Sequence, residues 1–422
     1  MIKLSFTLAG LALCNAVLAI AVPWYVVTRL GVGVETDAFF ASGALPQLIF
    51  LVTSFSLTQV LVPLLATGDE KSFRRDAWGF FLVVNAVFAL LAIILFATTG
   101  FWVSLLVPGF PAEARQLTVT LTRIQLLAMI GNASVVVLWS VYYARQKFIW
   151  AESSSLLANA IGLLFLFWTL PYYGIKAAAW ATVVTLGLKV VLLMPVLGPW
   201  QQPQWNSLAM KEAWRRIQPF LLGETYAKSD PLIDRFLTSL TTAGNLSLLY
   251  IGQQAYSAIN LIITRAIATP SVPRLAIAAK SRDWPSFRHI YRQRLTLMLS
   301  VTLAACAGLF LIGEPLLRLM IGHGGITEQN VHMLWWIMLA LSGLLIGAAG
   351  GQVTAGAFYA MGDTRTPTML FIVTYTVYIP IKIIVFLRYG IIGLAAATSL
   401  HLIINFLIQL ATLESAHLPK HD

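Results

Sequence analysis

The sequence has few charged residues and few cysteines. Only 11% of its 422 residues are charged, whereas a water-soluble chain of this size carries about 25%. This deficit argues against a soluble enzyme or a soluble binding domain. The two cysteines, Cys14 and Cys306, both lie in apolar runs, which argues against a disulfide framework or a cysteine-based metal cluster.

Motifs for nucleotide and metal chemistry are also missing. The "GVG" at residues 31–33 is too short for a phosphate-binding loop, and no Walker lysine follows a glycine-rich turn. His323 and His332 stand nine residues apart in an expected external loop, a weak basis for a metal site. We therefore predict a transporter rather than an enzyme, with no bound cofactor.

Long apolar runs are what the chain has in excess. Hydrophobic residues make up 58% of it, and runs of 18 or more can each cross a bilayer. We predict an all-α polytopic membrane protein, because a membrane barrel would show short alternating segments. The first run is expected to stay as a helix and not to be a cleaved signal peptide. About twelve transmembrane helices are expected, near residues 4–28, 38–66, 77–106, 117–143, 149–170, 174–198, 214–241, 245–273, 291–312, 330–360, 367–387 and 391–413.

The loop charges predict the orientation. The formal net charge is +11, and most lysines and arginines of the expected loops fall on one side of the membrane. Such residues accumulate in cytoplasmic loops, so both termini are expected in the cytoplasm. This explanation of the basic excess needs no nucleic-acid partner.

Three sequence echoes indicate an internal repeat. "YYGIKAAAWAT" ends at Thr182 and "RYGIIGLAAAT" ends at Thr398, 216 residues later, and Tyr143-Ala144 matches Tyr359-Ala360 at the same offset. "LVPLLA" at 61–66 resembles "SVPRLA" at 271–276.

Two six-helix lobes of equal orientation around a central cavity follow from this repeat. The polar, proline-rich segment between them is the expected connector. The predicted parts are an N-terminal lobe (1–200), a cytoplasmic connector (201–213), a C-terminal lobe (214–413) and a cytoplasmic tail (414–422).

Four basic residues within the expected spans are candidate ligands for an anionic headgroup. An arginine donates paired hydrogen bonds to a phosphate, and a lysine acts as a point charge. The alternative for each is that its long side chain reaches the membrane interface. Depth in the span favours the cavity for Lys189 and Lys382 over Arg123 and Arg265.

The segment "GETYAKSDPLIDRF" (223–236) has the densest charge of any expected span. Glu224 and Lys228 share one helix face, Asp230 and Asp234 share another, and Pro231 removes a backbone hydrogen bond. One interpretation is a coupling site for sodium or protons, with sodium at Asp230 and Asp234 and with Lys228 available to the substrate. The alternative is a structural set of ion pairs.

Two motifs have an architectural interpretation. In "VETDAFFASGALPQ" (34–47) we expect Thr36 and Asp37 to cap a helix and Pro46 to kink it. In "YAMGDTRTPTM" (359–369) we expect Asp363 and Arg365 to tie a cytoplasmic turn and Thr366 to cap the next helix.

These motifs also carry a family resemblance. Thr36-Asp37-Ala38-Phe39-Phe40, Leu45-Pro46 and Val62-Pro63 resemble the early signature of the MurJ/MviN family, lipid II flippases of the multidrug/oligosaccharidyl-lipid/polysaccharide exporter superfamily. "LVPGF" (106–110), "DRFLTSL" (234–240), "TPSVPRLA" (269–276) and "YAMGDTRTP" (359–367) resemble further landmarks, in the family's order.

The resemblance implies a function and its setting. The family moves polyprenyl-pyrophosphate-linked saccharides across the bacterial cytoplasmic membrane by rocking two lobes, powered by sodium or membrane potential. Membrane lipids and the machinery of glycan synthesis are the implied partners.

The sequence does not identify the cargo, because the arginines that the resemblance implies for binding the pyrophosphate are missing here. The first helix, "LALCNAVLAIAVPWYVV", and the run after Leu45-Pro46, "QLIFLVTSFSLTQ", contain no basic residue. Lipid II and an exopolysaccharide or O-antigen-type unit are both candidates. Two other functions remain as alternatives: a drug antiporter coupled through Glu224, Asp230 and Asp234, and a scaffold for glycan synthesis.

Overall fold

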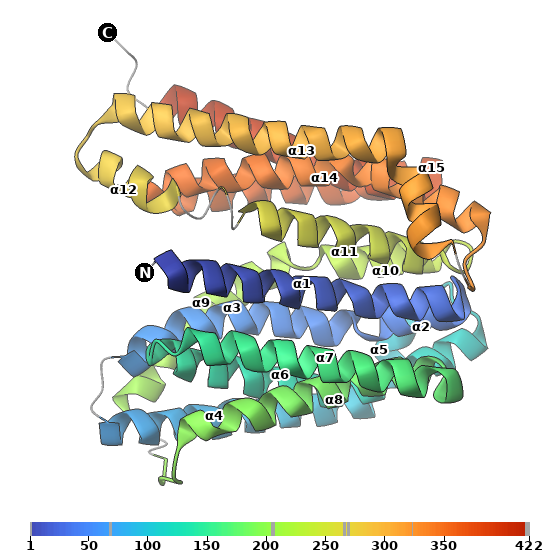
Figure 1. Cartoon of the computed structure of the whole chain (residues 1–422), viewed down its shortest axis with the longest axis horizontal. Coiled ribbons are helices and arrows are strands. Elements are labelled where there is room, and N and C mark those ends of the chain that lie inside the picture. Colours follow the sequence, from blue (N-terminus) through green and yellow to red (C-terminus); the bar gives the residue numbers. More distant parts are fainter. Residues whose placement is uncertain are drawn as a thin grey trace. The chain divides into compact units, whose positions relative to one another are not determined.

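The chain folds into helices alone over the part described by the computed structural model, residues 2–66, 70–203, 207–264, 267, 271–322 and 324–417. Contacts divide it into two compact units, Met1–Leu246 and Ser247–Asp422. Within each unit the helices run side by side (Figure 1). The expected all-α architecture is confirmed.

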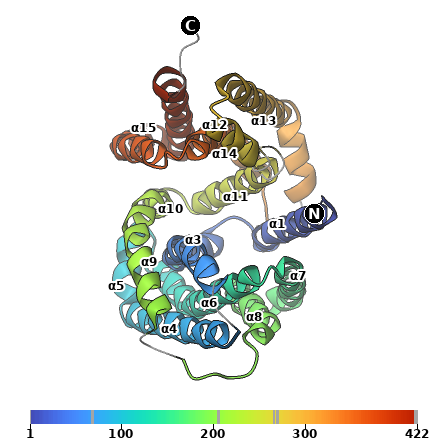
Figure 2. The same cartoon turned by 90° about the vertical axis from the view of Figure 1, so that its left-hand side faces the viewer.

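Unit 1 is built around one long central helix, α6. It packs against α3, α4 and α8, and α7 packs against both α1 and α8 (Figure 2). The elements are α1 (Ile2–Leu30), α2 (Val34–Ser42), α3 (Ala44–Ala66), α4 (Glu70–Ala97), α5 (Thr99–Leu106), α6 (Ala112–Ala144), α7 (Phe148–Tyr173), α8 (Ile175–Leu193), the short helix η1 (Met194–Leu197), α9 (Leu208–Ala227) and α10 (Asp230–Ser239).

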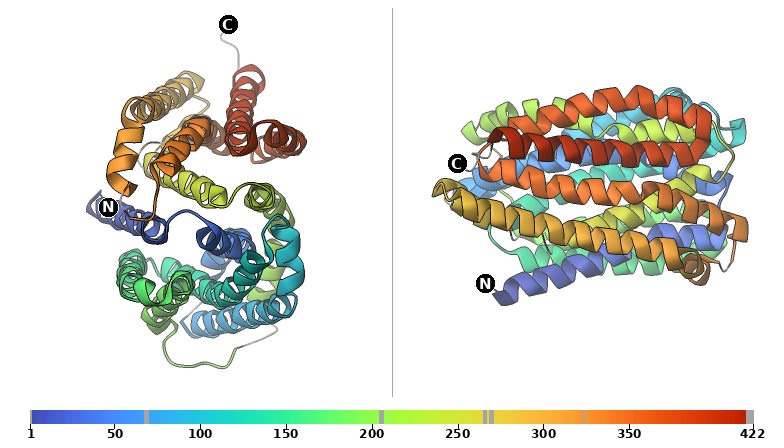
Figure 3. Two further views of the ribbon diagram at one scale, coloured as in Figure 1. Left: turned by 90° about the vertical axis from the view of Figure 1, so that its right-hand side faces the viewer. Right: turned by 90° about the horizontal axis from the view of Figure 1, so that it is seen from above.

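Unit 2 is built around α14, which packs against both α13 and α15. The elements are α11 (Asn245–Ile263), which begins at the boundary, α12 (Val272–Lys280), α13 (Trp284–Ile321), α14 (Glu328–Ala360), α15 (Arg365–Thr412) and η4 (Leu413–His417). Helix α15 turns back at Gly390, so it consists of two arms, drawn in red shades in Figure 3.

Ten helices among the described residues are long and apolar enough to cross a membrane. One of them, Arg365–Ser415, contains two of the expected spans because of its turn at Gly390. The expected span at 214–241 falls on α9 and α10, which are separated at Lys228 and Ser229 and are not among the ten. The polytopic membrane class is thus confirmed.

The internal repeat has a structural counterpart. Helices α6 and α14 are both 33 residues long and lie 216 residues apart. The hairpins that follow them turn at Gly174 (φ 55°, ψ −145°) and Gly390 (φ 60°, ψ −145°), a backbone conformation that is open almost only to glycine. The shared "YGI" sequence thus forms the same type of turn in both units. The lobe boundaries and the central cavity stay predictions.

The expected kink at Pro46 occurs as a break between α2 and α3. Proline has no N–H to donate to the carbonyl of Ser42, four residues earlier, and helix α2 ends at that residue. Thr122 of α6 donates its hydroxyl to this carbonyl at 3.3 Å, and both side chains are fully buried. The kink is therefore held by a neighbouring helix, as membrane helices require.

Thr122→Val is expected to lower the free energy of unfolding by about 1–3 kcal/mol, because it leaves the buried Ser42 carbonyl without this donor. Thr118→Val is the matched control: Thr118 is also fully buried on α6, but it donates only to Ala114 of its own helix. Thermal unfolding in detergent measures both. An equal loss of unfolding free energy in the two variants would show that the Thr122–Ser42 hydrogen bond does not hold the kink.

Candidate functional site

Asp37 joins α2 to the loop between α10 and α11. Its side chain is 3% exposed and accepts a hydrogen bond from the Gly244 N–H at 2.6 Å. Gly244 has φ 97°, and a Cβ there would lie 2.6 Å from a methyl group of Val32, so this position requires glycine. The side chain that caps α2 is Thr36, which accepts from the Gly33 N–H at 3.0 Å. The expected cap by Thr36 is confirmed, whereas a share of Asp37 in the cap and its role in gating stay predictions.

Unit 1 contains a polar cluster between α1, α7 and α8. Lys189 on α8 interacts electrostatically with Glu152 on α7. Asn15 on α1 donates to the Glu152 backbone carbonyl at 3.2 Å, Tyr143 donates to its carboxylate at 3.3 Å, and Asn159 donates to Asn15 at 2.9 Å. Sequence reasoning missed Glu152, although its charge within the expected span 149–170 was a sufficient signal.

Glu152→Gln should destabilise the protein by about 1–3 kcal/mol, because the half-buried Lys189 ammonium loses its counter-charge. The reversed pair Glu152→Lys with Lys189→Glu should recover more than half of that loss. A double-mutant cycle on thermal unfolding measures the coupling directly. Additive effects of the two single changes would contradict the pairing.

Unit 2 contains a second cluster between the two arms of α15. Lys382 is fully buried, and its ammonium lies 5.1 Å from the ring centre of Tyr378. The Tyr378 ring stacks on His401 at 4.3 Å between centres, and its hydroxyl lies 2.9 Å from that of Thr398. A lysine deep in a span was expected, but the aromatic and histidine surroundings were not.

The same interface continues toward the other end of the hairpin. Thr374 donates to Asn405 at 3.2 Å across the two arms, and Thr354 of α14 donates to Gln409 at 3.2 Å. Polar groups thus follow the inside of this hairpin over several turns. These two pairs satisfy their polar groups within the protein, as the bilayer interior requires.

A third polar region lies on the first turns of α13. The side chain of Asp283 accepts from the Ser286 N–H at 3.0 Å, which begins the helix and holds the pKa of Asp283 below its usual range. The expected span began only at 291. Residues 284–290 therefore belong to α13 and not to a loop. Their polar side chains lower the mean hydropathy, and for this reason the expected span did not include them.

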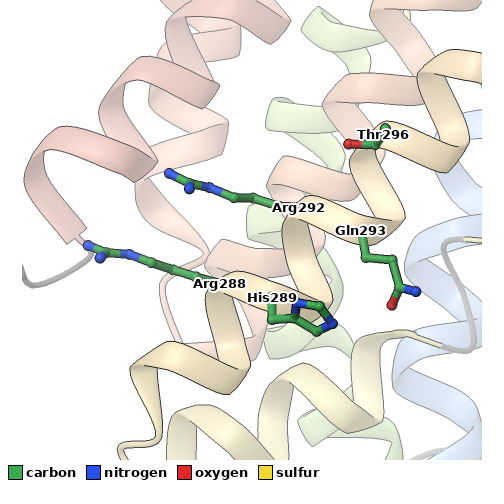
Figure 4. A pocket seen from close by; sticks show the side chains of 5 residues that line it. All are labelled: Arg288, His289, Arg292, Gln293 and Thr296. Carbon is green, nitrogen blue, oxygen red and sulfur yellow. The ribbon is translucent and has the colours of Figure 1, made fainter.

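These turns carry a basic hollow of about 420 Å³, lined by Arg288, His289, Arg292, Gln293 and Thr296 (Figure 4). The residues recur at helical spacing and so share one broad face. The two arginines point to one side of α13, and His289 and Gln293 point to the other. All are exposed except the half-buried Arg288.

One arginine of the hollow, Arg292, pairs with an acidic side chain. Arg292 forms two hydrogen bonds, of 3.2 and 3.0 Å, with the carboxylate of Glu414 in η4. This pairing holds its guanidinium across the end of α15. Polar residues exposed on a membrane helix usually face water or a polar ligand, so the hollow is a candidate binding site.

The acids expected to bind sodium lie where the α9–α10 helix is broken. Asp230 is the first residue of α10 and is half-buried, whereas Asp234 is 3% exposed. Lys228 lies in the break and is exposed. Glu224 belongs to α9, and its side chain lies outside the described part. Among the described residues no group of three metal ligands occurs, and the sodium site stays a prediction.

The remaining candidates lie apart from these clusters. Arg123 is exposed on α6, with its guanidinium 4.7 Å from the ring centre of Phe96. Arg265 lies outside the described residues. Asp363 accepts from the backbone N–H groups of Arg365 and Thr366, both at 3.0 Å. The turn is therefore tied as expected, but Asp363 rather than Thr366 caps α15.

Comparisons with known proteins agree with this architecture. The family model described as lipid II flippase MurJ matches residues 26–420. A probable lipid II flippase MurJ of Vibrio cholerae is 24% identical, covering 96% of this chain and 81% of the relative. One from Thermotoga maritima is 22% identical, covering 89% of this chain and 78% of the relative.

Two solved structures share the fold. Lipid II flippase MurJ in an inward closed conformation matches with a TM-score of 0.84 at 18% identity, covering 97% of this chain and 87% of the other. An inward-facing multidrug resistance MATE family transporter matches with 0.75 at 15% identity, covering 97% and 96%. Since the family model spans nearly the whole sequence, this chain belongs to the MurJ family and is a multi-pass membrane protein.

Proposed function

We propose that this protein is a flippase of the bacterial inner membrane that moves a polyprenyl-pyrophosphate-linked saccharide from the cytoplasmic to the external leaflet. Membership of the MurJ family supports the class of cargo, and the two-unit helical fold is suited to alternating access. Lipid II and an exopolysaccharide or O-antigen-type unit are the two cargoes that the proposal covers.

The observation that carries the proposal is the basic hollow on α13. A pyrophosphate is a multiply charged anion, and arginine binds such groups through paired, charge-assisted hydrogen bonds. Arg288 and Arg292 are one helical turn apart, and Figure 4 shows both pointing to the same side. The basic end of α13 is the expected cytoplasmic end, where the cargo would enter.

The hollow also offers groups suited to sugar hydroxyls. Thr296 lies one helical turn beyond Arg292 and is exposed, and the exposed Gln293 lies on the other side of α13 from the arginines. The cavity of about 420 Å³ has room for a diphosphate and the beginning of a glycan. In unit 1, the Lys189–Glu152 cluster is our candidate for a second polar contact. Lys382 is enclosed and Arg123 rests on Phe96, so we assign neither a contact with the cargo.

The antiporter alternative has less support. The likeness to a MATE transporter is a likeness of fold, whereas the family match is to MurJ. An organic cation would be repelled by the arginines of the hollow. Glycan synthesis enzymes as partners, and sodium or protons as the energy source, remain part of the proposal.

Complementation tests the function in cells. One recipient strain has its own lipid II flippase under repressible control, and a second lacks the flippase for an exopolysaccharide unit. We expect expression of this protein to restore growth in the first or polymer secretion in the second. Failure in both strains, with the protein present in the inner membrane, would contradict the proposed function.

A further inference from the structure

One buried hydroxyl of unit 1 is not hydrogen-bonded within the part of the chain that the structure describes. Ser155 on α7 is 2% exposed, and among the described residues its Oγ atom has no partner. Ser154 beside it is equally buried, but its hydroxyl donates to the Ala151 carbonyl at 3.0 Å. Buried polar groups in proteins nearly always have a partner, so the Ser155 hydroxyl points to a bound species.

Both carbonyl groups that a helical serine usually uses are already engaged here. Such a hydroxyl donates to the carbonyl three or four residues earlier. Four residues before Ser155 is Ala151, whose carbonyl accepts from Ser154. Three residues before it is Glu152, whose carbonyl accepts from Asn15 of α1 at 3.2 Å. The local backbone therefore leaves the Ser155 hydroxyl to another ligand.

Further oxygen atoms gather around this hydroxyl. Glu152, Ser155 and Asn159 are three and four residues apart, so they share one face of α7. The side chain of Asn15 spans them, because it donates to the Glu152 carbonyl and accepts from the Asn159 amide at 2.9 Å. Asn159 uses its nitrogen in this bond, and its amide oxygen is a further acceptor. We call Glu152, Ser155 and Asn159 the oxygen cluster.

Lys189 of α8 lies at the level of the oxygen cluster. Two contacts between α7 and α8 fix their register: Trp150 donates to the Leu192 carbonyl at 3.1 Å, and Gly162 packs closely on Thr185. Lys189 stands between the two contact residues of α8, and the oxygen cluster stands between the two contact residues of α7. The lysine interacts electrostatically with the carboxylate of the cluster, so this carboxylate already has one positive neighbour.

The ligand that fits these groups is a small monovalent cation. Oxygen atoms of carboxylates, hydroxyls and amides are the usual ligands of hard cations. Since Ser155 is almost fully buried, only a small species can reach its hydroxyl without moving the helices. The carboxylate would repel an anion. A divalent cation would add two charges beside the Lys189 ammonium, whereas a monovalent cation adds one.

We propose that the oxygen cluster is a sodium site inside unit 1, at which the ion competes with Lys189 for the Glu152 carboxylate. A bound sodium ion neutralises this carboxylate, and the lysine is left with an uncompensated positive charge. That charge attracts the pyrophosphate of the cargo, so binding of the ion and binding of the cargo reinforce each other. This site on α7 is not the one expected at the acids of α10. The coupling rests on the proposed flippase function, whereas the ion site does not.

Sodium binding is tested without any cargo, on the full-length protein in detergent. The midpoint of thermal unfolding is followed while sodium chloride replaces choline chloride at constant ionic strength, and the wild-type midpoint should rise with sodium. Ser155→Ala should weaken the apparent sodium affinity at least about tenfold, as the loss of a supporting group does at other metal sites. Ser154→Ala is the matched control, because this equally buried hydroxyl bonds only within its own helix, and it should leave the affinity unchanged.

Lys189→Gln distinguishes a bound ion from a bound water. The substitution removes the competing positive charge, so it should raise the apparent sodium affinity several-fold, whereas a water molecule would bring no sodium dependence. Equal sodium affinities in the wild type, Ser155→Ala and Lys189→Gln would place the ion elsewhere and overturn the proposal. A wild-type midpoint that does not respond to sodium would overturn it too, with a water molecule as the partner of Ser155.

Coupling is tested in proteoliposomes with a fluorescent polyprenyl-pyrophosphate glycan and an imposed sodium gradient at zero membrane potential. The wild-type rate should depend on sodium, and Ser154→Ala should respond as the wild type does. Ser155→Ala should need at least about tenfold more sodium for the same response. Sodium binding at the oxygen cluster without any effect of sodium on the rate would overturn the coupling. Absence of any flipping by the wild type would instead contradict the proposed function, and the thermal titration would still decide the ion site.

Discussion

Replacing Gly347 by alanine is expected to lower the free energy of unfolding by about 2–3 kcal/mol, because the added methyl group overpacks the α14–α15 interface. A Cβ at this position would lie 2.6 Å from the backbone nitrogen of Ile403 and in collision with the Leu402 carbonyl group. These are backbone atoms, which cannot rotate aside as a side chain can. Gly343, four residues earlier, would also collide with α15, at Ser399 and Ile403. The pair forms the small-residue stripe by which membrane helices approach closely.

Gly351 provides the control on the same helix. A Cβ there would meet nothing within 4 Å, and alanine is a better helix former than glycine by about 1 kcal/mol. Gly351→Ala should therefore be neutral or stabilising, so the two variants should differ in sign. Thermal unfolding in detergent, followed by tryptophan fluorescence, measures both. A Gly347→Ala protein as stable as wild type would mean that α14 and α15 do not pack as described.

The second large effect concerns the basic hollow. Replacing Arg288 and Arg292 together by glutamine should weaken binding of the pyrophosphate cargo at least about tenfold, since hydrogen bonds between charged groups contribute about 1.5–3 kcal/mol each. Glutamine retains polarity and much of the length of arginine but cannot neutralise a phosphate. Transport of the lipid-linked glycan should fall with it, while the free energy of unfolding should fall by at most about 1 kcal/mol, because the Arg292–Glu414 ion pair that is lost is largely exposed.

A matched variant tests whether position matters or only net charge. Arg215 and Arg216 on α9 are exposed and pair with Glu212. Arg215→Gln with Arg216→Gln removes the same two charges from the protein, and transport should remain near the wild-type rate. Equal losses in the two double variants would show that the hollow binds nothing and that the basic residues serve only membrane orientation.

The apolar runs predicted the spans well because length and hydropathy determine what a bilayer accepts. The two hairpins could also be found, since each needs a glycine at a positive φ and this requirement left the echo around Gly174 and Gly390. The kink at Pro46 was predicted for a similar reason, since a proline lacks the N–H that the helix needs at that position. Thr122, whose hydroxyl donates to the Ser42 carbonyl that Pro46 leaves without an N–H partner, lies 76 positions after the proline. It could not be found without the fold.

The candidate sites were less predictable. Depth in a span identified Lys382, but its contact with Tyr378 and the neighbouring His401 depends on the register of two arms of α15. The hollow on α13 was missed because its polar residues lower the hydropathy of the first turns. Windows of mean hydropathy therefore begin the span too late, at residue 291, and leave Arg288 outside it. Patterns of polar residues at helical spacing before an apolar run would have found it.

The most direct test of the central claim is translocation by the pure protein. Wild-type protein in proteoliposomes would be given fluorescent lipid II or a lipid-linked exopolysaccharide unit, and a reagent that cannot cross the membrane would report the outer-leaflet fraction. The account predicts transbilayer movement of at least one of these lipids, faster than in liposomes without protein and reduced by the Arg288→Gln and Arg292→Gln pair. Movement no faster than in protein-free liposomes for both lipids, under sodium gradients, pH gradients and an imposed membrane potential alike, would contradict it.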